Sequence, residues 1–174
     1  MADEEPIALK EVQLRLGVAQ HVLIHLCEKG VIEPDFAETS GRGKHREFSR
    51  RNLFEFGVAL AVRRLELPVA TAAMLIRLLR TFTRAVAKAV PEFELPGALL
   101  AHGTELALHL YDGHRLVLEA RGGAVRRTLF VGASIENASS PTSRPRIEKL
   151  DALPTHYDAQ VEINLTQIAR RIFE

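Results

Sequence analysis

The sequence is poor in cysteine and in aromatic residues. Its 174 residues include one cysteine, Cys27, and no tryptophan, and aromatic side chains make up 6% of the chain. A single cysteine cannot form a disulfide within the chain, which fits a reducing compartment. We therefore expect a cytoplasmic protein, and we interpret Cys27 as a small buried apolar side chain rather than a sensor thiol.

Long apolar runs and catalytic motifs are also missing. Four basic residues interrupt the most apolar stretch, residues 69–90, so it is too charged to span a membrane. The acidic start, residues 1–6, has no apolar segment and is not expected to act as a signal peptide. No nucleophile–base grouping, phosphate-binding glycine loop or paired carboxylates appear in a recognisable context. The sequence thus predicts no enzyme, no cofactor, no metal and no membrane partner.

Charge is nearly balanced overall but unevenly distributed. The net charge is +1, while residues 1–90 contain 14 Lys and Arg against 11 Asp and Glu, and residues 91–174 contain 9 against 11. Basic residues are densest between Gly41 and Arg51, where five of them accompany one carboxylate. A local cluster of this kind matters more for phosphate binding than the net charge does.

Helical spacing near the N-terminus predicts two short helices joined by a tight turn. The first covers residues 9–16 and ends at Gly17; the second covers residues 19–29 and ends at Gly30. Two helices separated by a short glycine-containing turn are typical of a helix-turn-helix, whose second helix normally enters the major groove of DNA.

A basic hairpin and two further helices are expected next. Residues 35–48 lack a helical period, and Gly41 and Gly43 indicate a hairpin turn. Ser49 is a candidate N-cap for a helix over residues 50–65, and a longer helix is expected over residues 70–90. The residues expected to face the core are Leu53, Phe56, Leu60, Leu75, Leu78, Leu79, Phe82 and Val86.

The last third of the chain changes to a period of two, which predicts strands. Three strands are expected between residues 105 and 132, with Asp112-Gly113 as a two-residue hairpin turn. A fourth strand covers residues 160–165, and Thr166 is expected to cap a short final helix. The predicted fold is α+β: a winged helix-turn-helix over residues 1–68, a long helix and linker over 69–96, and a small antiparallel β domain with a C-terminal helix over 97–174.

The order of the N-terminal features resembles the DNA-binding domain of the MerR family. The resemblance covers about residues 7–80, and it depends on order and spacing rather than on any single piece. It is carried by Gly17-Val18, Val22-Leu23, Gly30-Val31-Ile32, Lys44-His45-Arg46-Glu47-Phe48-Ser49 and Leu65-Glu66-Leu67-Pro68-Val69. It implies a transcriptional regulator that binds double-stranded DNA as a homodimer, with RNA polymerase or another protein as a further partner.

The chain departs from the family pattern at several positions. The Thr, Arg and Tyr of the family's second helix are replaced by Val22, Ile24 and His25, and the two wing tyrosines by His45 and Phe48, while Arg46 is retained. The arginine lost at position 24 is one that normally helps to hold DNA. The cysteines with which metal-sensing members bind their ions are absent.

Candidate DNA contacts divide into two groups. Gln20, His21, Ile24 and His25 lie on one helical stripe and are candidates for reading base edges, because Gln can bond adenine and Ile can touch a thymine methyl. The alternative is an ordinary exposed face or a protein contact. The candidate phosphate contacts are Arg42, Lys44, His45, Arg46, Arg50 and Arg51; the alternative is a solvated loop.

The remaining histidines predict little chemistry. His21 and His25 are four residues apart, but no further ligand pair is in register for a metal site. His102, His109 and His114 gather near the first hairpin, where they could line a pocket; we expect surface histidines, because no acidic partner is indicated. Two other functions remain open: a protein-interaction adaptor, and a phage-type DNA-architecture factor that reuses the winged fold.

Overall fold

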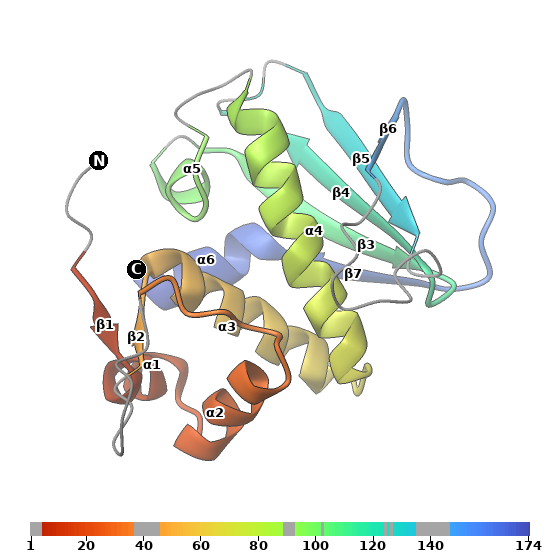
Figure 1. Ribbon diagram of the computed structural model, residues 1–174. Helices are drawn as coiled ribbons and strands as arrows, with labels where there is room; N and C mark the ends of the chain where they lie inside the picture. Colours follow the sequence, from red (N-terminus) through yellow and green to blue (C-terminus); the bar gives the residue numbers. More distant parts are fainter. Residues whose placement is uncertain are drawn as a thin grey trace.

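The computed structural model describes residues 5–36, 46–88, 93–101, 103–123, 125, 127–134 and 147–174. Within them lie six helices, a five-stranded antiparallel sheet and a two-stranded sheet, so the predicted α+β class is confirmed. Figure 1 shows the short N-terminal helices on one side, the long helix α4 (Val69–Ala87) across the middle and the larger sheet on the other side of it. No helix in the described ranges is long and apolar enough to cross a membrane.

The two short N-terminal helices form as the spacing predicts. Helix α1 covers Leu9–Leu16 and ends at Gly17, whose φ of 63° lies in the left-handed region that favours glycine. Helix α2 covers Gln20–Glu28, with Ala19 and Lys29 as its caps. A two-stranded ribbon, β1 (Ile7–Ala8) with β2 (Glu47–Phe48), lies beside them. It was not predicted, because two-residue strands are too short to show a period.

Helix α3, Arg50–Arg64, is buried on nearly all sides. Ser49 caps it as predicted, and Asn52 completes a capping box. The core-facing positions Leu53, Phe56 and Leu60 are confirmed, but all of residues 52–60 are buried. At Gly57 a Cβ atom would lie 2.4 Å from Cδ1 of Ile172, so the glycine permits close packing of α3 against the C-terminal helix.

The larger sheet has the strand order β6-β5-β4-β3-β7, with every pair antiparallel. Asp112 and Gly113 have φ values of 50° and 73°, which confirms the predicted hairpin turn between β3 and β4. Strand β6 and the short helix α5 were not predicted. The strands are β3 (Glu105–Tyr111), β4 (Arg115–Arg121), β5 (Leu129–Ser134), β6 (Glu148–Leu150) and β7 (Gln160–Asn164), and α5 is Gly97–Leu100.

The C-terminal helix α6, Leu165–Phe173, follows β7 directly. Its N-cap is Asn164, whose side chain accepts a hydrogen bond from Gln167 N at 2.8 Å. The expectation that Thr166 caps this helix was wrong. Thr166 is buried, and its Oγ1 instead accepts a hydrogen bond from the backbone N–H of Leu106 at 2.8 Å. This bond ties the second residue of α6 to the start of β3.

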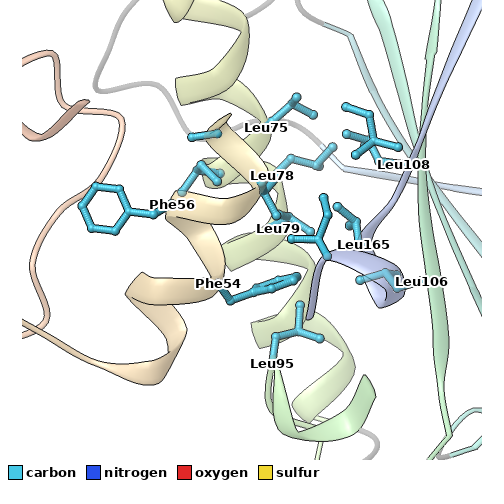
Figure 2. Close-up of a cluster of buried hydrophobic side chains, with 14 of the residues drawn as sticks. Phe54, Phe56, Leu75, Leu78, Leu79, Leu95, Leu106, Leu108 and Leu165 are labelled. Carbon is cyan, nitrogen blue, oxygen red and sulfur yellow. The ribbon is translucent and has the colours of Figure 1, made fainter. Parts of the chain in front are cut away.

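One continuous apolar core joins the helices to one face of the sheet. In Figure 2, leucines of α4 (Val69–Ala87) point toward Leu106 and Leu108 of β3, with Leu165 of α6 between them. All the predicted core positions of α4 are buried. The leucines of β3 are therefore covered by α4 and α6 within the same chain.

Candidate nucleic-acid interface

Helix α2 presents the candidate base-reading residues on its outer side. The turn before it is closed by hydrogen bonds from Gly17 N to Gln13 O (2.9 Å) and from Val22 N to Ala19 O (3.0 Å). Leu23 and Leu26 are fully buried and fix the inner side of the helix. The four candidates differ in exposure: Gln20 and His21 are exposed, whereas Ile24 and His25 are half-buried.

The structure describes only the two ends of the segment predicted to form the basic hairpin. Arg42, Lys44 and His45 lie outside the described residues. Arg46 is half-buried directly before β2. Strand β2 pairs with β1 in the register Ile7↔Phe48, and Phe48 packs edge-on against Phe56 at 5.2 Å between ring centroids. Strand β2, which ends the predicted hairpin, is therefore anchored both to the N-terminal strand and to α3.

A buried amide joins the described residues on either side of the segment predicted to form the hairpin. The side chain of Asn52 is fully buried at the start of α3. Its Oδ1 accepts from the backbone N–H of Asp35 (2.8 Å), before the hairpin, and of Ser49 (3.3 Å), after it. Its Nδ2 donates to the carbonyl oxygen of Glu33 at 3.0 Å and to Oε2 of Glu55 at 3.1 Å. We call Glu33, Asp35, Ser49, Asn52, Glu55 and Arg80 the hairpin clamp.

An ion pair extends the hairpin clamp to α4. Glu55 is buried, and both its carboxylate oxygens accept from Arg80, Oε1 from Nε and Oε2 from Nη2, each at 2.6 Å. Arg80 also reaches Glu33, with Nη1 3.1 Å from Oε2. The hydrogen bond from Glu55 raises the pKa of the Arg80 guanidinium above its ordinary value, against the opposing effect of burial. This bidentate pair fixes α3 and α4 relative to the hairpin base.

Two of the predicted phosphate contacts already have partners within the protein. Arg51 pairs with the carboxylate of Asp35, with its Nε 3.2 Å from Oδ2 and its Nη2 bonded to Oδ1, and Ser49 Oγ donates to the same carboxylate. The Arg50 guanidinium lies 5.0 Å from the ring centroid of Phe173 at the end of α6. Both side chains are thus oriented, and both keep N–H donors beyond these contacts.

Sequence reasoning missed the hairpin clamp. Asn52 and Glu55 interrupt an otherwise apolar helix three residues apart, and Arg80 interrupts the apolar face of α4. Polar residues at core positions are a usable signal, since a buried charge requires a partner. Which partner they find depends on the tertiary packing, which spacing along the chain does not reveal.

The structure corrects the interpretation of His109. It was expected to be a surface histidine without an acidic partner, but it is 3% exposed. Its Nε2 lies 3.0 Å from Oε2 of Glu119, and its Nδ1 lies 2.9 Å from Nε2 of Gln160. The signal was the hairpin register: His109 pairs with Val117, which places Glu119 on the diagonal. His114 is exposed as expected, and His102 lies outside the described residues.

The remaining candidates from the sequence are Cys27 and a metal site. Cys27 is half-buried and packs against the core. In the parts of the chain that the structure describes, no three His, Cys, Asp or Glu side chains are grouped to hold a metal ion. No protein-family model matches this chain, and no curated protein matches it significantly.

Proposed function

We propose that the protein is a sequence-specific DNA-binding transcriptional regulator similar to the MerR family. The observation that supports this most is the arrangement of α1 and α2. Two helices joined by a three-residue turn expose polar residues at the start of the second helix, Gln20 and His21, and Asn52 joins the described residues on either side of the segment predicted to form a basic hairpin. A helix-turn-helix uses the N-terminal residues of its second helix to contact base edges.

Each group of residues has a defined role in this proposal. Gln20 bonds an adenine edge, His21 and His25 supply further polar contacts, and Ile24 packs on a thymine methyl. The six candidate phosphate contacts between Arg42 and Arg51 bind the DNA backbone, and the charge of the phosphates dominates the affinity. Arg51 contributes through N–H groups not directed at Asp35. The protein binds as a homodimer, with the two α2 helices in major grooves about 34 Å apart. No reaction and no cofactor are part of this function.

The test compares one base-reading and one phosphate-contacting variant by mobility shift. Wild-type protein is expected to shift fragments of genomic DNA at low salt. Arg46→Ala should weaken binding to every probe and reduce the dependence of log affinity on log salt by about one unit, whereas Gln20→Ala should change the preference among probes. Lys10→Ala on α1 is the matched control. Absence of any shift by the wild type would refute the proposal, and equal effects of the two variants on every probe would refute the assigned roles.

A protein-interaction adaptor is the second candidate. Leu14 on α1 is 72% exposed, Ile24 replaces the family arginine, and Arg50 and Arg51 have intramolecular partners. An apolar surface with few unengaged charges suits a protein partner better than DNA. A co-purifying partner that is lost with Ile24→Ser, together with no DNA shift, would favour this function. A phage-type DNA-architecture role is the third; it predicts bending of any bound fragment and phage genes as neighbours.

A further inference from the structure

A polar pocket lies on the face of the larger sheet that does not pack on α4. Side chains alternate along a strand, so Leu106 and Leu108 enter the core while Ala107 and His109 face the other way. A pocket of about 420 Å³ is lined by residues of β3, β4 and β7, by Leu153 in the loop before β7, and by the first turns of α6. This volume lies within the range of about 300–1,000 Å³ that small-molecule sites occupy.

The pocket exists because a small residue lies in the middle of a row of long ones. Ala107 on β3 is flanked by Glu119 on β4 and by Asn164 on β7. Two residues further along β3, on the same face, His109 lies opposite Glu162 of β7. Strands are about 4.8 Å apart, so β4 and β7 are about 10 Å apart across Ala107. The carboxylates of Glu119 and Glu162 lie on opposite sides of the His109 imidazole, 3.0 Å from its Nε2 and 3.9 Å from its Nδ1, next to the hollow over Ala107.

His109 holds Glu119 in place rather than acting on a ligand. An ionised carboxylate only accepts hydrogen bonds, so Nε2 of His109 is the donor to Glu119. Nδ1 then accepts from the amide nitrogen of Gln160, an assignment that satisfies both contacts. Both ring nitrogens are occupied, so the imidazole does not offer a lone pair to a substrate. The second oxygen of Glu119 remains directed at the pocket side of β4, 3.8 Å from Arg121 Nη1.

The residues around the pocket carry charges of both signs. Glu105 is neutralised by Arg121, whose Nε lies 2.7 Å from Oε2. Glu162 is half exposed, and its Oε2 lies 3.9 Å from Nδ1 of His109. Gln167 and Arg170 come from α6 and line the same pocket with exposed side chains. The sheet thus offers carboxylates, and the helix offers a guanidinium and an amide.

We propose that this pocket binds a small zwitterion of the amino-acid class. Its ammonium group lies above Ala107, beside the carboxylates of Glu119 and Glu162, and its carboxylate is held by Arg170 and Gln167. A purely anionic ligand would meet the carboxylates of the sheet, and a purely cationic one would leave Arg170 without a partner. Charge-assisted hydrogen bonds at both ends are the strong kind and also fix the orientation of the ligand. This inference does not depend on DNA binding.

The test uses the full-length protein and a series of unbranched ω-amino acids with two to six carbons. Each is compared with its matched alkylamine and matched carboxylate by isothermal titration calorimetry, while the ring resonances of His109 are followed by NMR as the reporter of the site. At least one zwitterion should bind about tenfold more tightly than both of its matched compounds and shift the His109 signals. The series of lengths ensures that failure does not reflect one unsuitable spacing.

Two variants separate the ends of the ligand. Glu162→Gln should weaken the zwitterion and the alkylamine alike, by about tenfold, and Arg170→Gln should weaken the zwitterion while leaving the alkylamine unchanged. Glu148→Gln on β6, outside the pocket, is the control and should bind as the wild type does. The proposal is overturned if no zwitterion exceeds its matched compounds, or if binding persists unchanged in both pocket variants.

Discussion

Replacing Asn52 by alanine should destabilise the protein more than any other amide-to-alanine change in the described chain. The side chain makes four hydrogen bonds, at 2.8, 3.0, 3.1 and 3.3 Å, and is fully buried. A net value of about 1 kcal/mol per bond applies to such contacts, and a bond to a charged acceptor such as Glu55 is worth more. The longest bond, from Ser49 N, is the weakest of the four. We expect a loss of about 3 kcal/mol.

The assay is thermal and urea unfolding of Asn52→Ala beside Asn164→Ala. For a chain of this length about 1 kcal/mol corresponds to roughly 2–4 °C, so Asn52→Ala should lower Tm by about 6–12 °C. Asn164 is an exposed N-cap with one side-chain hydrogen bond, and its removal should cost about 1 kcal/mol. This comparison keeps the chemical change the same and varies only burial and bonding.

Amide hydrogen exchange tests whether the Asn52 side chain holds the backbone of Asp35 and Ser49. In Asn52→Ala the backbone N–H groups of Asp35 and Ser49 lose their acceptor, so both should exchange faster under native conditions, while the amides of β4 follow only global stability. If the two asparagine variants were equally stable, or if the Asp35 and Ser49 amides kept their protection, the hairpin clamp would not hold the hairpin as described.

Two further predictions concern the ion pair and the buried tyrosine. Arg80→Met leaves the buried carboxylate of Glu55 without its cation and should lower the free energy of urea unfolding by about 3–5 kcal/mol. The double variant Arg80→Met, Glu55→Leu should recover at least half of that loss. No recovery would contradict the ion-pair account. Burial, together with Tyr157 and Glu119, raises the pKa of Tyr111 above its ordinary value of 10.0. On raising the pH, Tyr111 therefore ionises first in the unfolded chain. The stability that the neutral Tyr111 contributes is present below pH 10 and is lost as the pH rises through the folded pKa. Tyr111→Phe should therefore show a shallower alkaline loss of stability, and its absorbance titration should lack the tyrosine signal at raised pH that Tyr111 gives in the wild type. An unchanged titration would refute the assignment.

Local signals in the sequence predicted much of the fold. Gly17 ends α1 because the left-handed conformation suits glycine, Ser49 caps α3 through its own side chain, and Asp112-Gly113 turns the first hairpin. The broad apolar face of α4 has a clear helical period and was placed correctly. Each of these features is determined by residues within a few positions of one another.

The errors arose where distant residues decide the outcome. Apolar residues are spread around helix α3 instead of forming one stripe, so periodicity identified three core positions in a helix that is buried throughout residues 52–60. His109 alternates with leucines and therefore read as solvent-facing, but Gln160 of β7 and Glu119 of β4 enclose it. Thr166 has the chemistry of a cap, yet Asn164 lies at the required position once β7 runs on without a break. The DNA-contact residues themselves remain predictions.

Strand β7 and helix α6 are joined without a linker, and this joint connects two distant parts of the molecule. Asn164 is both the last residue of the strand and the N-cap of the helix, and Thr166 ties the joint to β3. Helix α6 is nine residues long, is seated on α3 at Gly57, and ends with Phe173 beneath Arg50. Strand β7 lines the pocket, and the helix that follows it directly contacts Arg50 through Phe173. The wall of the pocket and one predicted phosphate contact are therefore linked by a single uninterrupted segment of the chain.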